Sequence, residues 1–280
     1  MHWQTRRFSL DLSRPRVMGI VNVTPDSFSD GGQHDDTRTA IAHCERLVAE
    51  GADILDIGGE STRPGAPRVD ADSEWARIAD VLAAAVTLGV PVSVDTYKPD
   101  VMRRALDAGA DIINDVQALQ LPGALAAVAG SGAGVCLMHM RGEPASMNDL
   151  ALYGDIVAEV GAFLALRAHA ARESGIPAEC IVLDPGYGFA KTAEHNLRLL
   201  AGQQRLAELG YPLLVGWSRK RTLGDITGRA VDQRLAGSLA AALRAVSAGA
   251  KVLRVHDVPA TVDAVKVWAA VDGATIPAFK

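Results

Sequence analysis

The chain has 280 residues and a formal net charge of −5, with 28 Lys and Arg against 33 Asp and Glu. This mildly acidic balance argues against a surface for generic nucleic-acid or anionic-membrane binding, so an anionic ligand would need a local basic cluster. Hydrophobic residues make up 49% of the chain and aromatic residues only 5%, which favours layered strands under Ala-rich helices in one large core.

Strand and helix patterns alternate along the chain. The predicted strands span residues 17–23, 54–57, 92–95, 112–114, 135–139, 181–184, 213–217 and 252–256. The predicted helices span residues 37–50, 73–88, 99–108, 123–129, 153–173, 194–209, 232–248 and 259–271. Three similar segments, GADILD (51–56), GADIIN (109–114) and GAKVLR (249–254), each follow an Ala-rich stretch and read as a glycine helix end followed by a strand.

Strictly alternating strands and helices imply a parallel sheet. Eight repeats in a chain of this length favour an α/β fold with a closed (β/α)8 barrel, which commonly takes about 250 residues. We expect one domain over residues 1–280, with residues 1–16 and 273–280 peripheral. The alternative is an open Rossmann-like sheet, but no GxGxxG motif follows the first strand.

The cysteines and the N-terminal segment bear on location. Cys44, Cys136 and Cys180 lie in apolar surroundings without the spacing of a metal site, so we expect reduced thiols in a cytoplasmic protein. No apolar segment after Arg6 and Arg7 resembles a signal peptide, and no run approaches membrane-spanning length.

The stretch ILDIGGESTRPG (54–65) reads as a buried strand that runs into a binding loop. Two connections, residues 24–36 and 60–72, are long, polar and rich in Gly and Pro. Long loops on the active face of a barrel are commonly lids, although a loop of this kind can also be a simple insertion. We expect both to become ordered only when ligands bind.

Each predicted strand ends in a polar residue. These residues are Asn22, Asp56, Asp95, Asn114 with Asp115, His139, Asp184, residues 218–221, and Arg254 with His256. A single one has an ordinary explanation, since Asp56 could cap a helix and His139 could be a core histidine. A barrel, however, directs all eight strand ends into one mouth.

The chemistry of this ring predicts the ligand. Asp95, Asn114 and Asp184 suit the edge of a planar heterocycle with an exocyclic amine. Lys220 with Arg219 and Arg221, followed by Arg254 and His256, suits phosphate or carboxylate oxygens. Asn22 could help to hold Mg²⁺ against a phosphate, since that ion uses few protein ligands and several waters. A pyrophosphorylated heterocycle would fit both sets.

Seven motifs together closely resemble the dihydropteroate synthase family of the folate pathway, the target of sulfonamides. They are NVTPDSFSD (22–30), GESTRPG (59–65), VDT (94–96), IND (113–115), DPGYGFAK (184–191), GWSRK (216–220) and RVH (254–256). The resemblance runs from about residue 18 to residue 268. It implies a pterin-binding barrel and a transferase that joins 6-hydroxymethyl-7,8-dihydropterin pyrophosphate to p-aminobenzoate, giving 7,8-dihydropteroate and pyrophosphate.

The resemblance also implies roles for individual residues. Those that match the pterin site are Asp95, Asn114, Asp184 and Lys220, with Met138 packing nearby. Those that match the pyrophosphate site are Asn22, with Mg²⁺, and Arg63, Arg254 and His256. Those that match the aminobenzoate pocket are Thr62, Phe189, Ser218, Arg219 and Lys220, and Gly216 is a further expected substrate-binding residue. Phe28, Asp35 and Ser61 match the mobile loops, with Asp36 an alternative to Asp35. We expect Asp95, Asp184, Lys220 and Arg254 to be catalytic, and family members are typically homodimers.

The residues suggest the mechanism independently. An aniline amine is a poor nucleophile, which favours early departure of pyrophosphate and capture of a pterin-stabilised cation. Such a route needs anion clamps and carboxylates near the cation rather than a general base. The chain departs from the family at Arg221, where many members carry Ser; backbone amides at the following helix start could still bind the benzoate carboxylate.

Three other functions fit part of the pattern. A corrinoid-dependent pterin methyltransferase would share the barrel but has no use for the cations. A sugar-phosphate aldolase would use Lys220 as a Schiff base, with Arg219 and Arg221 favouring its neutral amine. A non-catalytic paralogue would bind pterin without releasing pyrophosphate. Only small-molecule substrates are expected, with no nucleic acid or membrane partner.

Overall fold

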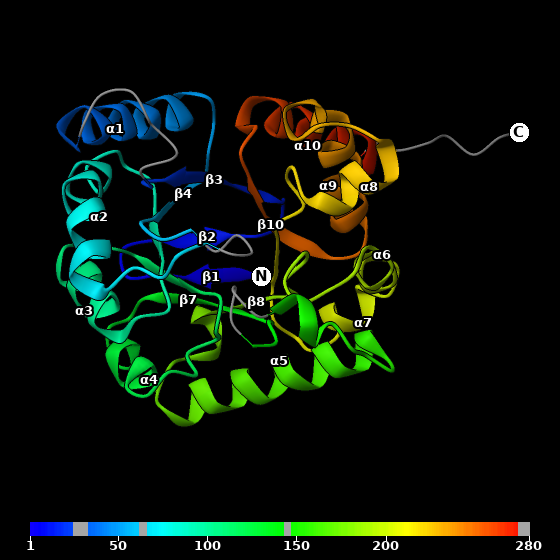
Figure 1. Ribbon diagram of the computed structural model, residues 1–280, viewed down its shortest axis with the longest axis horizontal. Coiled ribbons are helices and arrows are strands. Elements are labelled where there is room, and N and C mark those ends of the chain that lie inside the picture. The colour runs from blue at the N-terminus through cyan, green and yellow to red at the C-terminus, as the bar shows by residue number, and fades with distance from the viewer. Residues whose placement is uncertain (25–32, 62–65, 143–146, 274–280) are drawn as a thin grey trace, which may run out of the picture.

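A closed parallel barrel forms the centre of the molecule (Figure 1). The computed structural model describes residues 1–24, 33–61, 66–142 and 147–273. The barrel strands are β3 (Arg16–Asn22), β4 (Ile54–Gly58), β5 (Val92–Asp95), β6 (Ile112–Asp115), β7 (Gly134–Met138), β8 (Ile181–Asp184), β9 (Leu213–Val215) and β10 (Ala250–Val255). β10 pairs with β3 and closes the ring. The predicted (β/α)8 fold is confirmed.

Helices surround the barrel on its outer side (Figure 1). They are α1 (Gln33–Ala49), α2 (Ala71–Ala85), α3 (Pro99–Asp107), α4 (Ala124–Val128), α5 (Ile156–Glu173), α6 (Ala193–Ala201), α7 (Gln204–Ala207), α8 (Arg221–Thr227), α9 (Leu235–Ser247) and α10 (Val258–Asp272). Short 3₁₀ turns are η2 (Met147–Leu150), η3 (Ala178–Cys180) and η4 (Val231–Gln233). Because helices cover the outer face and side chains fill the inside, β4, β6, β7, β8 and β9 are buried along their whole length.

Three elements differ from the sequence-based expectation. The helix predicted over 194–209 is two helices, separated at Gly202, where a Cβ atom would lie 2.7 Å from a Val157 methyl group. The strand predicted to reach residue 217 ends at Val215, because the chain turns through Arg219 with a left-handed φ of 58°. That turn leads into α8, a seven-residue helix that was not predicted.

The expectation that residues 1–16 are peripheral was wrong. β1 (His2–Gln4) and β2 (Ser9–Asp11) form an antiparallel hairpin, which Figure 1 shows in front of the barrel. Trp3 and Leu12 are fully buried in one cluster with residues near the start of the barrel strands, among them Met18, Ile54 and Ile112. The Trp3 indole N–H donates to the carbonyl oxygen of Cys180 at 2.9 Å. The hairpin therefore closes the end of the barrel where the strands begin.

We expect Trp3→Ala to lower the free energy of unfolding by about 3–5 kcal/mol, because a fully buried indole leaves a cavity. Urea unfolding followed by circular dichroism would measure this loss. The matched control is Trp75→Ala, at a partly exposed position of α2. Equal losses in the two variants would contradict the closing role of the hairpin.

Two further features concern the helices and the cysteines. Over the described residues, the structure contains no helix that is both long enough and apolar enough to cross a membrane. Cys44, Cys136 and Cys180 are buried free thiols, and burial raises the pKa of each. They are therefore held as neutral thiols in the core, as the sequence predicted.

Candidate active site

A cavity of about 1010 Å³ opens at the carboxyl ends of the barrel strands. The predicted site residues that line it are Asn22, Ser61, Asp95, Asn114, Met138, Asp184, Phe189, Gly216, Ser218, Arg219, Lys220, Arg254 and His256. Phe28, Thr62, Arg63 and the Asp35 side chain lie outside the described residues. Gly216 contributes space, since a Cβ atom built there would meet no atom within 4 Å. The strand ends therefore converge on one cavity.

Arg254 connects β10 to the opposite side of the mouth. Its Nε–H donates to Asp56 at 2.6 Å, and an Nη2–H donates to Asp95 at 2.7 Å. Burial lowers the pKa of Arg254, but the two carboxylates outweigh it, and the net shift is upward. The guanidinium is therefore permanently charged. The sequence predicted one set of acceptor residues and a separate set of cations around the cavity. Arg254 pairs with the carboxylates of Asp56 and Asp95, so the two sets are not fully separate.

Asp95 has a raised pKa. Burial raises the pKa of Asp95 to about 7, against the opposing effect of the Arg254 guanidinium. With a guanidinium nitrogen only 2.7 Å away, we expect the carboxylate to be the form that pairs with Arg254. Asp95 therefore has two ways to affect a ligand: it lines the cavity itself, and it helps to hold the Arg254 guanidinium in place.

Asn114 and Asp184 present acceptors to the cavity. The Asn114 amide nitrogen lies 3.3 and 3.4 Å from the two carboxylate oxygens of Asp56, which directs the Asn114 carbonyl oxygen toward other donors. The Asp184 Oδ1 accepts from the Gly186 N–H at 2.7 Å. Burial raises the pKa of Asp184 to about 6, although Gly186 and Lys220 oppose this. Asp184 is therefore mainly ionised at neutral pH.

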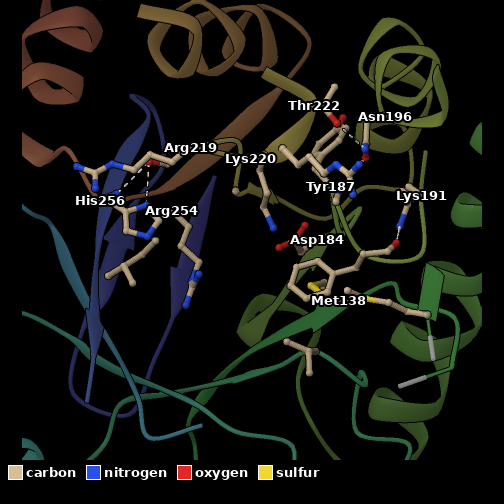
Figure 2. A pocket seen from close by; sticks show the side chains of 18 of the residues that line it. Met138, Asp184, Tyr187, Lys191, Asn196, Arg219, Lys220, Thr222, Arg254 and His256 are labelled. Carbon is tan, nitrogen blue, oxygen red and sulfur yellow. Dashed lines mark hydrogen bonds between the residues drawn. The ribbon is translucent and has the colours of Figure 1, made fainter. Parts of the chain in front are cut away.

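Lys220 is a half-buried cation in the loop after β9. Figure 2 shows its side chain pointing toward Asp184. Its Nζ lies 4.2 Å from the centre of the Phe189 ring. Burial lowers the pKa of Lys220 to about 8, and the nearby Arg254 charge adds to this, while Asp184 and Asp95 oppose it. The amine is thus predominantly protonated at neutral pH.

The cations that flank Lys220 are placed differently. Arg219 pairs with Asp257 through two of its nitrogens, and the Arg221 side chain is 90% exposed. Both line the same cavity as Lys220, so the expected anion-binding set stays a prediction, in which Arg219 already has a carboxylate partner. The low pKa of Lys220 comes from burial and Arg254, whereas the aldolase alternative had assigned it to Arg219 and Arg221.

Ser218 and His256 form a polar pair at the ends of β9 and β10. The Ser218 Oγ lies 3.0 Å from the His256 Nδ1 and accepts from the His256 backbone N–H at 3.2 Å. Burial lowers the pKa of His256 to about 4, helped by Arg254. His256 is therefore neutral at physiological pH, and its ring carries one N–H donor rather than a positive charge.

Three strand-end residues do not line the cavity. Asp56 is fully buried and pairs with Arg254. Asp115 turns back into its own loop, where it accepts from the N–H groups of Gln117 and Leu119. His139 is a buried histidine that contacts Lys191. The sequence reasoning also missed cavity residues from the loop after β8 and from α6 and α8: Tyr187, Lys191, Asn196 and Thr222. Tyr187 and Lys191 lie within the quoted motif 184–191, but no pattern there indicates a buried lysine.

The oxygen ligands of the cavity suit a metal ion that binds together with a phosphate-bearing substrate. The described residues contain no group of three or more His, Cys, Asp and Glu able to hold a metal ion, and Asp56 and Asp95 are occupied by Arg254. Asn22 offers a neutral carboxamide at the cavity wall. This donor set suits Mg²⁺ bound chiefly by phosphate oxygens and water.

Comparisons with known proteins agree on one family. The sequence pattern of a family described as "Pterin binding enzyme" matches residues 18–256. A dihydropteroate synthase of Neisseria meningitidis serogroup B is 50% identical over 275 residues, covering 96% of each chain. The Xanthomonas albilineans dihydropteroate synthase with 4-aminobenzoic acid is 53% identical, with a TM-score of 0.93, covering 98% of this chain and 100% of that one. The same organism's enzyme in complex with 7,8-dihydropteroate is 51% identical, with a TM-score of 0.89, covering 97% of this chain and 100% of that one.

Proposed function

The chain belongs to the dihydropteroate synthases, the pterin-binding transferases of folate synthesis, and from this premise we propose how its cavity carries out their reaction. Members join 6-hydroxymethyl-7,8-dihydropterin pyrophosphate to p-aminobenzoate, and pyrophosphate leaves. The observation that carries the assignment to this cavity is the convergence of Asn114, Asp184, Lys220, Arg254 and His256 on one mouth.

The pterin ring is bound between β6 and β8. Its amine and ring N–H groups donate to Asp184 and to the Asn114 carbonyl oxygen, both fixed by the bonds described above. Lys220 donates to the ring oxygen or nitrogen from the opposite side. Met138 is only 3% exposed and packs with Val116, Met140 and Met147, so it supplies an apolar surface beside the ring.

The pyrophosphate is bound beside β3 and β10. A guanidinium has five N–H donors, and Asp56 and Asp95 use two of those of Arg254. The others, with the neutral His256 ring, are available to phosphate oxygens. Asn22 would hold Mg²⁺ together with those oxygens and water; that ion would neutralise leaving-group charge when it is bound. Arg63 is assigned here by the family resemblance alone.

The p-aminobenzoate ring is bound between Phe189 and the turn at residues 218–220. Lys220 lies over the Phe189 ring, and the adjacent Ser218 and Arg219 line the cavity. The benzoate carboxylate faces the start of α8, which follows Lys220 directly. Thr62 belongs to this pocket by the family resemblance. Sulfonamides, as aminobenzoate analogues, are expected to compete here.

The arrangement favours a dissociative route. Arg254 and His256 hold the departing pyrophosphate, to which Mg²⁺ would add positive charge when bound, while Asp95 and Asp184 stabilise the positive charge that develops on the pterin methylene. The aniline nitrogen then attacks the cation and loses its proton to water. Because the electrophile is strong, a poor nucleophile suffices and no strong general base is needed. Asp95, Asp184, Lys220 and Arg254 are accordingly the proposed catalytic residues.

The test of this function is pyrophosphate release. The purified protein, with Mg²⁺, is expected to release pyrophosphate when pterin pyrophosphate and p-aminobenzoate are both present, and to form dihydropteroate in equal amount. Tight pterin binding without any release would identify a non-catalytic paralogue instead. Methyl transfer from a methylated pterin would identify the methyltransferase alternative.

The rate is expected to depend on pH through Asp184 and Lys220. The Asp184 pKa of about 6 predicts that kcat/KM for pterin pyrophosphate rises with pH as this carboxyl ionises. The Lys220 pKa of about 8 predicts that it falls again as the ammonium loses its proton. Lys220→Met should remove the alkaline limb from the residual activity, and an identical limb in that variant would contradict the assignment.

Two further properties belong to this proposal. Exposed apolar side chains lie on α8, η4, α9 and α10: Ile226, Val231, Leu235, Val267 and Val271. Figure 1 shows α8, α9 and α10 gathered on one side of the barrel. This surface fits a second copy of the chain, and sedimentation velocity would detect the homodimer. The three free buried cysteines fit the reducing cytoplasm.

A further inference from the structure

Lys191 is a second lysine of the cavity wall, and the proposed reaction assigns it no role. It lies in the loop between β8 and α6 and is 8% exposed. Its Nζ donates to the carbonyl oxygens of Gly186 at 2.9 Å and Phe189 at 3.0 Å, and it lies 3.0 Å from the His139 Nδ1. Figure 2 shows Lys191 on the far side of Asp184 from Arg254.

The contacts fit a charged ammonium. Burial lowers the pKa of His139 to about 2, and the neighbouring Lys191 adds to this, so the imidazole is neutral and its Nδ1 can accept. An ammonium has three N–H groups, which match the three acceptors at 2.9–3.0 Å. A neutral amine would turn its lone pair toward one of them. Burial nevertheless lowers the pKa of Lys191, and the Asp184 carboxylate opposes this.

The loop that Lys191 holds has an unfavourable backbone. Gly186 has a φ of +69°, and a Cβ atom there would lie 2.0 Å from the His139 carbonyl oxygen. Gly188 has a φ of +82°, and the non-glycine Ala190 has a φ of +50°. Glycine adopts a positive φ readily, whereas the left-handed conformation of Ala190 persists only where surrounding contacts enforce it. The ammonium supplies such contacts, because it binds two carbonyls of the loop and a neighbouring strand end at once.

The bonds to Lys191 bear on Phe189 more than on Asp184. The Phe189 carbonyl is bound directly, and its N–H donates to the Gly186 carbonyl that Lys191 also binds. The Phe189 ring in turn contacts Lys220. Asp184 belongs to β8, and its backbone carbonyl accepts from the His139 N–H at 2.9 Å. The Asp184 side chain is linked to the loop through the Gly186 N–H, but its backbone position is set by the barrel strand. Loss of the ammonium should therefore displace the Phe189 ring more than the Asp184 carboxylate.

We propose that Lys191 is a positioning residue. By binding the carbonyl oxygens of Gly186 and Phe189, it fixes Phe189 and thereby the p-aminobenzoate subsite. This inference deepens the proposed function and rests on it. It predicts that loss of Lys191 weakens the binding of p-aminobenzoate but not the binding of the pterin, because the aminobenzoate site depends on the loop and the pterin site depends on strand ends.

The test compares Lys191→Met with the wild-type enzyme. KM for p-aminobenzoate is expected to rise roughly ten- to a hundredfold, since small displacements of a binding group have effects of this size. Pterin affinity is measured by calorimetry without p-aminobenzoate at about pH 8, because loss of the Lys191 charge raises the pKa of Asp184 and this carboxyl must stay ionised in both proteins. There it is expected to change by less than about twofold, since no bond to Asp184 or Asn114 is removed. The matched control is Lys266→Met, at an exposed position of α10, which should alter neither value.

A double-variant cycle distinguishes positioning from general support of the fold. Phe189→Ala should itself raise KM for p-aminobenzoate, and adding Lys191→Met should raise it little further, because the ring through which Lys191 acts is already gone. Independent, multiplicative losses would overturn the proposal, and so would equal losses of pterin and aminobenzoate binding. Lys191→Gln, which keeps two N–H donors, carries the same test if the methionine variant does not fold. Absence of activity in the wild-type protein would refute the proposed function instead.

Discussion

Asp184→Asn is expected to keep the fold and to weaken pterin binding at least about a hundredfold, because a buried acceptor becomes a donor. The Gly186 N–H donates to Oδ1 at 2.7 Å, so the asparagine carbonyl oxygen will keep that position. Its NH₂ group must then take the place of Oδ2 and face the N–H groups of the pterin. Calorimetry with a pterin ligand measures the loss.

The control for this substitution is Asp263→Asn, at an exposed position of α10, which should leave pterin affinity unchanged. Circular dichroism and the melting temperature would establish that both variants fold. An unchanged dissociation constant in Asp184→Asn would show that this carboxylate does not contact the ring, and the pterin site would have to lie elsewhere in the cavity.

Arg254→Met is expected to lower both activity and stability. It removes a phosphate clamp, and by analogy with the loss of one charge-stabilising donor, kcat/KM for pterin pyrophosphate should fall roughly 10²–10³-fold. It also leaves the fully buried Asp56 and its neighbour Asp95 without a counter-charge. Breaking such a pair costs about 3–5 kcal/mol of the free energy of unfolding. Steady-state kinetics, inhibition by pyrophosphate and urea unfolding give the three values.

A second substitution separates these two effects. Arg254→Met combined with Asp95→Asn removes one of the uncompensated charges, so it should recover part of the lost stability. Activity should stay low, because the clamp is still missing. Recovery of pyrophosphate inhibition together with stability would mean that Arg254 acts only by neutralising Asp95, and its proposed contact with the leaving group would be wrong.

The sequence predicted most of the barrel because local pattern and burial agree there. The predicted bounds of β5 and β8 match those observed, since both are short apolar runs that end in a carboxylate. The hairpin β1–β2 was missed, because three-residue strands have no detectable periodicity. Helix α8 was missed because RTLGDIT is too short for a helical pattern and follows a turn whose left-handed Arg219 has no signal in the sequence.

Site residues were predicted as a set, but their pairings were not. A barrel sends strand ends to one mouth, so Asp184, Lys220 and Arg254 were expected together. The approach of Arg254 to Asp56 and Asp95 depends on side-chain direction inside the barrel, which no local pattern encodes. The same holds for Arg219, which turns to Asp257, and for Lys191, whose acceptors are backbone carbonyls brought together by the fold.

One isotope measurement tests directly whether the cavity stabilises a pterin cation as pyrophosphate leaves. In a single turnover, pterin pyrophosphate with two deuterium atoms on the methylene next to pyrophosphate is compared with unlabelled substrate. If the C–O bond breaks first, the methylene carbon becomes trigonal and its C–H bending modes loosen, so the deuterated substrate should react measurably more slowly. Equal rates for the chemical step would mean that the amine attacks while the pyrophosphate is still attached, and would contradict the account.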